Sequence, residues 1–383
     1  MSQTVNLSHR VTSIKEYVFA QLARDVKIIE EKTGKKVLNF GPGTPDVPPN
    51  SKIINKLNEF NQLPSAHLYP GYGAIPEFNK SLIDHFKSRF GVQLDPSELL
   101  PLLGGKDGVV HLPFVVADKG DEILVPNPGY PAYSGSMELF GIKATPYTLS
   151  ESNFQHTLDN IKRMINSKTK AIWVNFPSNP TGQVATVSEL AQIVDLARKN
   201  HIIILFDNAY SEITFDGYVA PSILQVPNAK EVCVEIGSFS KSFSLAGFRI
   251  GWVVGNSQII ANLGKFKSQL DSGLSIPLQK LGALALDHND HDWHNQMIDS
   301  YKSRRDIIAQ KLINHGLTFS IPKGSLYIWA KIPDKCPDST AFCREMLKQN
   351  HVLFTPGTAF GTQGDRYIRV SICINISNIE DYL

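Results

Sequence analysis

Short, nearly continuous apolar segments alternate with longer amphipathic segments through the middle of the chain. The apolar segments are rich in β-branched residues, and they are Asp121–Pro126, Lys170–Phe176, His201–Asp207 and Glu231–Ser238. Strands that are buried on both faces have this character, as in a parallel sheet covered by helices. Between two of them, Ser188–Asn200 has apolar positions at helical spacing behind a serine cap. The pattern predicts a doubly wound α/β domain.

A different pattern follows toward the C-terminus. Asp292–Gly316 is predicted to form one long amphipathic helix, and short strands are predicted at Ser325–Ile332 and Arg366–Cys373. These elements indicate a smaller α+β domain. We therefore divide the chain into an N-terminal segment that joins the small domain, a large domain and a small C-terminal domain, at residues 1–49, 50–288 and 289–383.

Composition limits the possible partners. The 383 residues are 42% hydrophobic and 19% charged, which is typical of a globular protein, and the formal net charge is +2. Without a basic block, neither nucleic acid nor a membrane surface is expected as a partner. The sequence shows no signal peptide and no run of about 18 apolar residues, so no membrane span is expected.

Cysteine and histidine spacing adds two expectations. The four cysteines form no CxxC pair, which favours free thiols in a reducing cytoplasm. The histidines of residues 287–294 have no partner ligands nearby in the sequence, so no metal site is expected.

Polar residues follow each of the four predicted strands. In an open parallel sheet, ligands bind beyond the carboxyl ends of the strands. We therefore expect an aromatic ring, an amide, an acid and an amine to meet at one edge of the sheet. The residues concerned are Tyr130, Asn179, Asp207, Tyr210, Ser238, Ser240 and Lys241.

This set matches the chemistry of pyridoxal phosphate (PLP). The Lys241 amine could form a Schiff base with the aldehyde. Asp207, at the end of the most apolar strand, could keep the ring nitrogen protonated by charge pairing. The Tyr210 hydroxyl and the Asn179 amide suit the phenolic oxygen, and Tyr130 could stack on the ring.

A phosphate group needs donors, and the sequence offers them. Ser238 and Ser240 carry hydroxyls, and Arg249 carries a guanidinium. A glycine turn also opens the apolar helix predicted within Leu102–Ala117, and a helix N-terminus favours an anion. Pro113 is expected to kink this helix or to interrupt one of its hydrogen bonds.

Each candidate also has an ordinary structural role open to it. Lys241 could be a solvated charge, Asp207 a helix cap, and Asn179 a turn residue before a proline. Tyr130 and Tyr210 could be packing aromatics. The coincidence of all of them at strand ends favours the cofactor site.

Longer motifs carry a resemblance to a known family. NFPSNPTG, DNAYSEITFDG, SFSKSFSLAGFRIGW and YIRVSI occur in this order, and with them the chain resembles the fold-type I, class I/II aminotransferases over nearly its whole length. FGPGTPD, YPGYG, GGKDG and PNPGYPAY are most similar to the LL-diaminopimelate aminotransferase branch and its aspartate- or alanine-using relatives. The resemblance implies transfer of an amino group between an amino acid and a 2-oxo acid, with 2-oxoglutarate and glutamate as one pair, in amino-acid metabolism such as lysine biosynthesis.

The resemblance implies cofactor roles. Lys241 would be the Schiff-base lysine and proton shuttle, Asp207 the partner of the pyridinium, and Tyr210 the third catalytic residue. The residues that hold the phosphate would be Ser238, Ser240, Arg249 and the backbone at Gly105 and Lys106, with Gly105 standing where the family more often has serine.

The resemblance also implies roles in substrate binding and assembly. Arg369 would clamp the substrate α-carboxylate near Gly41, because its planar fork binds a carboxylate in bidentate fashion. Tyr130 and Asn179 would also contact substrate, and Tyr17 and Lys106 would lie near its distal end. In a homodimer with shared sites, Tyr69 would reach the phosphate of the neighbouring subunit.

Two alternatives use the same fold. The same residues could catalyse β-elimination or decarboxylation, because fold does not determine reaction. A non-enzymatic PLP-sensing regulatory module is a further alternative. The complete catalytic set, the near-neutral charge and the lack of an extra N-terminal domain argue against the regulatory module.

Overall fold

Alternate residues of each central strand are buried on opposite faces of one seven-stranded sheet. The computed structural model describes residues 5, 7–12, 18–150, 153–287 and 291–383. The strand order is β2-β8-β7-β6-β5-β3-β4, and β8 alone runs antiparallel to its neighbours. The strands are β2 (Leu99–Leu102), β3 (Glu122–Asn127), β4 (Lys143–Thr148), β5 (Thr169–Asn175), β6 (Ile203–Asp207), β7 (Cys233–Ser238) and β8 (Gly251–Gly255). The predicted mostly parallel α/β sheet is confirmed.

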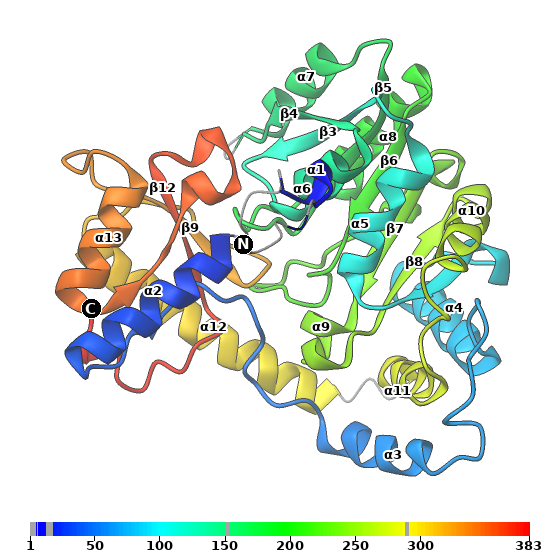
Figure 1. Ribbon diagram of the computed structural model, residues 1–383, viewed down its shortest axis with the longest axis horizontal. Helices are drawn as coiled ribbons and strands as arrows, with labels where there is room; N and C mark the ends of the chain where they lie inside the picture. The colour runs from blue at the N-terminus through cyan, green and yellow to red at the C-terminus, as the bar shows by residue number, and fades with distance from the viewer. Residues whose placement is uncertain (1–4, 6, 13–17, 151–152, 288–290) are drawn as a thin grey trace.

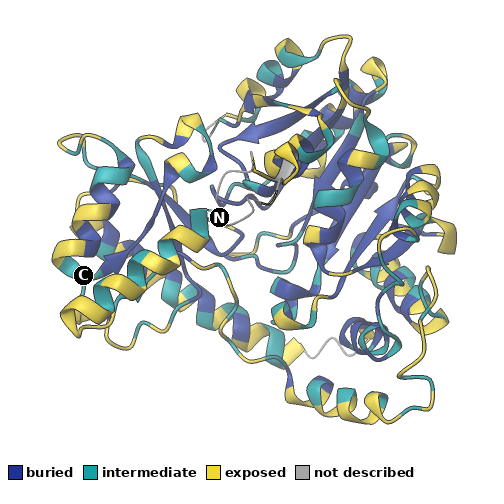
Figure 2. Cartoon of the chain, viewed as in Figure 1, coloured by how far each residue is buried: buried dark blue, intermediate teal, exposed yellow. Residues whose placement is uncertain are grey.

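Helices cover both faces of this sheet, and Figure 2 shows its strands as mostly buried. The helices are α3 (Ser51–Asn61), α4 (Pro76–Phe90), α5 (Gly105–Val116), α6 (Ala132–Phe140), α7 (Phe154–Met164), α8 (Val187–Asn200), α9 (Phe239–Ser242), α10 (Ser257–Lys267) and α11 (Ile276–Asp287). In β5, Ile172 and Val174 belong to the same apolar cluster as residues of α4, α7, α8 and α11, whereas Ala171 and Trp173 belong to a cluster with residues of α5, α6 and α10. This two-sided burial explains why the strand sequences are continuously apolar.

A smaller layer lies beside the large sheet, with α12 running between the two (Figure 1). Its antiparallel sheet has the order β11-β12-β9, and β1 pairs in parallel with β10. The elements are α1 (His9–Thr12), α2 (Val18–Thr33), β1 (Leu38–Asn39), α12 (His291–Asn314), β9 (Tyr327–Lys331), α13 (Ser339–Asn350), β10 (Val352–Leu353), β11 (Thr355–Pro356) and β12 (Tyr367–Ser371). The N-terminal segment thus contributes a strand beside the C-terminal part, while the three domain boundaries remain a prediction.

Two local expectations can be compared with the structure. The N-cap of α8 is Thr186 and not Ser188: the Thr186 hydroxyl accepts from the Glu189 N–H at 3.2 Å, and the Glu189 carboxylate accepts from the Thr186 N–H at 2.8 Å. The second expectation concerns Pro113, which is predicted from the sequence to kink its helix or to interrupt a hydrogen bond. Helix α5 continues through Pro113 to Val116. Pro113 has no N–H to donate to the preceding turn, so the expected interruption is one missing hydrogen bond.

The structure also bears on the class of protein. Among the described residues, none of the helices combines the length and the hydrophobicity that a bilayer-spanning segment needs. Cys233, Cys336, Cys343 and Cys373 are free thiols.

Glu235 is a carboxylic acid inside β7 that is fully buried. Its side chain accepts hydrogen bonds from the Asn208 amide at 2.9 Å, from the Ile223 N–H at 3.1 Å and from the Ser222 hydroxyl. Burial disfavours the charged form and raises the pKa of Glu235 to about 7, although the hydrogen bonds from Ser222 and Asn208 oppose this shift.

We expect Glu235 to make the protein less stable as pH rises from about 4.5 to about 7. In this window the folded state holds a proton that the unfolded state has lost, so the free energy of unfolding falls with pH. Glu235→Gln cannot titrate. The stability of wild type relative to this variant should therefore fall by on the order of 3 kcal/mol across the window, measured by denaturant unfolding at several pH values.

Glu122→Gln is the matched control. Hydrogen bonds to its carboxylate lower the pKa of Glu122 to about 2, and the hydrogen bond from Lys143 has the largest effect. The stability that this carboxylate adds is complete above its unfolded pKa and is lost only as pH falls toward 2. The difference between wild type and Glu122→Gln should thus be flat above about pH 5. A flat difference for Glu235→Gln as well would contradict the assignment.

Candidate active site

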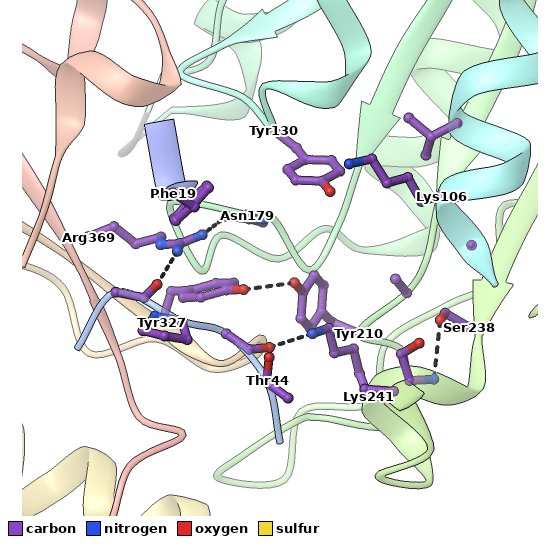
Figure 3. Close-up of a pocket in the computed structure, with 18 of the residues that line it drawn as sticks. Phe19, Thr44, Lys106, Tyr130, Asn179, Tyr210, Ser238, Lys241, Tyr327 and Arg369 are labelled. Carbon is purple, nitrogen blue, oxygen red and sulfur yellow. Dashed lines mark hydrogen bonds between the residues drawn. The ribbon is translucent and has the colours of Figure 1, made fainter. Parts of the chain in front are cut away.

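A cavity of about 490 Å³ lies at the carboxyl ends of β3, β5, β6 and β7 (Figure 3). Other walls come from α2, residues 39–44, the start of α5, β9 and β12. The cavity brings together most of the sequence-predicted residues: Gly41, Gly105, Lys106, Tyr130, Asn179, Asp207, Tyr210, Ser238, Ser240, Lys241, Arg249 and Arg369. Tyr69 is 86% exposed and outside this lining. Tyr17 falls outside the described residues.

Asp207 is a buried carboxylate at the end of β6. Its Oδ2 accepts from the Tyr133 hydroxyl at 2.8 Å, and its Oδ1 accepts from the Ala209 N–H at 3.1 Å. Burial raises the pKa of Asp207, and these two hydrogen bonds oppose the rise. The site thus holds a buried carboxylate whose ionised form a nearby positive charge would stabilise.

Tyr133 is itself held in place. Burial, followed by the Asp207 charge, raises the pKa of Tyr133 well above its usual value, so it stays a donor. Its ring stacks on Trp173 with centroids 4.7 Å apart, and Tyr130 meets it edge-on at 5.6 Å. Tyr133 therefore connects the buried acid to Tyr130, the ring that is predicted from the sequence to stack on the cofactor.

Asn175, the last residue of β5, ties two predicted residues together. Its Nδ2 donates to the Asp207 carbonyl at 2.8 Å, and its Oδ1 accepts from the Asn179 N–H at 2.8 Å. The loop after β5 is thereby held against the end of β6. This is why Asn179 and Asp207 face the same cavity.

Lys241 lies on the one-turn helix α9 directly after β7. The Ser238 hydroxyl caps this turn by accepting from the Ser240 N–H at 3.2 Å. The Lys241 Nζ donates to the Gly43 carbonyl, across the cavity from its own strand (Figure 3). The amine is thus directed into the cavity and away from bulk solvent.

The side chains of Tyr210 and Tyr327 contact each other in the lining of this cavity. Their hydroxyl oxygens are 3.1 Å apart, and both side chains are buried. Burial and then the Tyr327 hydroxyl raise the pKa of Tyr210 well above its usual value, so the hydroxyl keeps its proton. Gly43 is required here, because a Cβ at that position would lie 1.8 Å from the Tyr327 hydroxyl oxygen.

Arg369, on β12, is a nearly fully buried cation. Its Nη1 donates to the Asn179 Oδ1 at 2.9 Å, and its Nη2 donates to the Gly41 carbonyl at 2.6 Å. Its Nε has no hydrogen-bond partner within the described part of the chain. Three aromatic rings surround the guanidinium, with centroids 4.1, 4.7 and 4.9 Å from Cζ: Tyr327, Phe360 and Phe19. A buried cation with unused donor capacity suits a carboxylate ligand.

Arg249 lies at the opposite end of the cavity, near the start of α5. Its Nη1 donates to the Ser240 hydroxyl at 3.3 Å and to the Ala246 carbonyl at 2.8 Å. Gly104 has a φ of +82°, which favours glycine, and a Cβ there would lie 2.3 Å from the Arg249 Nη2, so a larger residue would displace the guanidinium. Two serine hydroxyls, a guanidinium and a helix N-terminus converge here, which is the donor set that a phosphate requires.

The donor set as a whole fits PLP. An amine, a buried carboxylate and a phosphate-type cradle surround one cavity, with an arginine beyond them. Lys106 extends from α5 toward the Tyr130 side of the cavity (Figure 3). The residues present could therefore hold a phosphorylated, aldehyde-bearing ring and an amino-acid carboxylate together.

The lining residues that sequence reasoning missed include Phe19, Tyr133, Asn175 and Tyr327. Asn175 could have been found, because it lies one residue before the end of the predicted strand Lys170–Phe176. Tyr133 follows Tyr130 by one helical turn, which is a weaker signal. Phe19 and Tyr327 come from distant parts of the chain, and only the fold brings them here.

Comparisons with known proteins identify the family. The family model for aminotransferase class I and II matches residues 35–383. The LL-diaminopimelate aminotransferase of Dehalococcoides mccartyi (strain CBDB1) is 39% identical over 379 residues, covering 98% of this chain and 97% of that protein. The LL-diaminopimelate aminotransferase of Halothermothrix orenii is 38% identical, covering 98% and 96%.

Solved structures show the same fold. Apo-BacF from Bacillus subtilis is 30% identical with a TM-score of 0.90, covering 99% of this chain and 96% of that chain. The aspartate aminotransferase of Thermotoga maritima is 25% identical with a TM-score of 0.89, covering 98% and 97%. The family is generally PLP-dependent, and the predicted class of enzyme is confirmed. The chain belongs to the aminotransferase class I and II family.

Proposed function

We propose that this chain is a PLP-dependent aminotransferase that moves the amino group of an LL-diaminopimelate-type amino acid to 2-oxoglutarate, which becomes glutamate, and that catalyses the reverse transfer from glutamate. The observation that carries the proposal is the meeting of Lys241, Asp207 and Arg369 in one cavity. An amine, an acid for the ring nitrogen and a carboxylate clamp are the three groups that amino transfer on PLP requires.

The position of each residue in the cavity determines its proposed role in the reaction. Bound PLP supplies an electron sink that stabilises negative charge at the substrate α-carbon. The Asp207 carboxylate lies where it can favour a protonated ring nitrogen, and Tyr133 and Ala209 help to keep it ionised. The Lys241 Nζ acts as the base that removes the proton from the substrate α-carbon and later returns it.

Arg369 orients the substrate. The Asn179 amide oxygen and the Gly41 carbonyl hold its guanidinium plane, so the fork is fixed before substrate arrives. A fixed fork loses little entropy when it binds a carboxylate, and it places the α-carbon relative to Lys241.

The substrate class rests on the relatives. Curated LL-diaminopimelate aminotransferases match nearly the whole chain. We assign Lys106, at the Tyr130 side of the cavity, to the distal end of the substrate, with Tyr17 as a second candidate. The proposed setting is cytoplasmic lysine biosynthesis.

The deciding assay compares amino donors. The purified, PLP-loaded protein is given LL-diaminopimelate, aspartate or alanine with 2-oxoglutarate, and glutamate is measured. LL-diaminopimelate should give the highest kcat/KM. A preference for aspartate or alanine would overturn the substrate, and release of ammonia or carbon dioxide without glutamate would overturn amino transfer.

Lys241→Ala should lower kcat for glutamate formation by about 10³-fold or more, because the proton-transfer group is lost. Borohydride treatment should link PLP to the wild-type chain but not to this variant, as seen by intact mass. Lys230→Ala, which removes a lysine paired with Glu98 at 2.6 Å, is the control and should behave as wild type. Full activity in Lys241→Ala would refute its role.

Tyr133→Phe should shift the acidic limb of the pH profile of kcat/KM to higher pH by roughly one unit. Without this donor, the pKa of Asp207 rises, so its charge is lost at a higher pH. Tyr147→Phe is the control, because this buried hydroxyl donates at 2.9 Å to the Trp173 carbonyl. If the acidic limb of the pH profile does not move in Tyr133→Phe, the Tyr133 hydroxyl does not lower the pKa of Asp207.

We also assign a homodimer with shared sites. Tyr69 and Tyr72 are exposed at 86% and 61% although both are large aromatics. An exposed tyrosine in the loop between α3 and α4 is available to a neighbouring subunit, where its hydroxyl would reach the phosphate.

Mixing two variants tests this sharing. Lys241→Ala and Tyr69→Ala should each be weakly active alone. When co-expressed, they should recover about a quarter of wild-type activity, because half of the dimers are mixed and each mixed dimer has one intact site. Activity no greater than the sum of the separate variants would show that the sites are not shared.

A further inference from the structure

Lys267 is a buried lysine whose role the site described so far does not explain. It is the last residue of α10, and only 5% of its surface is exposed. Its Nζ lies 2.5 Å from the Asp107 Oδ2 and 2.7 Å from the Asp271 Oδ2. Lysine is rarely buried to this degree unless it is paired.

Its partner Asp107 lies in the first turn of α5. The Asp107 carboxylate accepts from the Leu103 N–H at 2.8 Å and contacts the His111 Nδ1 at 2.6 Å. It therefore fixes the backbone immediately before Gly104, the glycine that must pass close to Arg249. Within the described chain, neither Asp107 nor Lys267 belongs to the cavity lining.

The charge of Asp107 poses an electrostatic problem. A carboxylate in the first turn stabilises a helix, but it also repels an anion at the same helix N-terminus. Burial tends to raise the pKa of Asp107, yet the hydrogen bond with His111 and the attraction of Lys267 outweigh this and keep its pKa below the usual value. The carboxylate is thus present as a charge and needs a cation beside it.

We propose that the Lys267–Asp107 ion pair positions the turn from Leu103 to Lys106 and neutralises the carboxylate at the start of α5, so that a phosphate can bind there. The inference rests on the proposed binding of PLP. Asp107 supplies the acceptor that shapes the turn, and Lys267 removes the repulsion that this acceptor would exert on the phosphate.

A purely structural ion pair is the alternative, because α10 packs against α5. Buried ion pairs are often replaceable by apolar residues without loss of stability. The two roles differ in one measurable property. Loss of the neutralising charge would weaken the binding of a ligand that carries a phosphate. A general loosening of the fold would weaken the binding of ligands with or without a phosphate.

The experiment titrates the apoprotein with PLP and with pyridoxal, which lacks the phosphate. Lys267→Met should raise the Kd for PLP about tenfold or more and leave the Kd for pyridoxal within about twofold. In the double variant with Asp107→Asn, the Kd for PLP should return toward wild type. The asparagine oxygen still accepts from the Leu103 N–H, and the negative charge in the first turn of α5 is gone, while the Asp271 carboxylate remains as in the single variant.

Lys230→Met is the matched control, because it breaks a lysine ion pair in the same domain, at Glu98. It should leave both Kd values unchanged. If Lys267→Met does not fold, Lys267→Gln gives the same test, with a smaller change in the same direction.

An unchanged ratio of the two Kd values in the Lys267 variants overturns the inference. Wild type that binds neither PLP nor pyridoxal overturns the proposed function instead. The two failures are therefore distinguishable.

Discussion

The burial of a single carboxylate, that of Asp207, is the constraint on which the site depends. A carboxylate at the end of a buried strand loses its hydration, which disfavours its charge. Two neighbouring donors, the Tyr133 hydroxyl and the Ala209 N–H, hydrogen-bond to the carboxylate and partly replace its lost hydration. Tyr133 in turn is held by its stacking on Trp173. A cationic ring nitrogen would complete the compensation, because an opposite charge at short range favours the ionised form.

Much of this arrangement follows from the sequence through one rule. The strands are recognisable because their burial on both faces makes them continuously apolar, and their carboxyl ends identify the cavity. Asp207 ends such a strand, and Asn179 and Lys241 lie just after two others, so the amino-acid sequence alone is enough to place them at one edge of the sheet.

The remaining residues depend on contacts that no local pattern encodes. Tyr327 lies on β9, more than a hundred residues beyond Tyr210 in the chain, and the two hydroxyls meet only because Tyr210 packs into the core of the smaller layer. Phe19 reaches Arg369 from the N-terminal helix α2. The predicted cap of α8 is wrong by two residues, because Thr186 and Ser188 carry the same kind of hydroxyl and only the backbone geometry selects between them.

The position of Arg369 has a consequence for the substrate. One guanidinium, carried by the small antiparallel sheet, bonds the N-terminal segment at Gly41 and the loop of the large sheet at Asn179. Under the proposed role of Arg369, an amino acid bound there by its carboxylate would be held by a group that is already anchored to three separate stretches of the chain. Its position would therefore depend on how these stretches pack together. A simple amine, which carries no carboxylate, would not gain this contact, so the proposed preference for amino acids over amines would rest on the packing of the two layers.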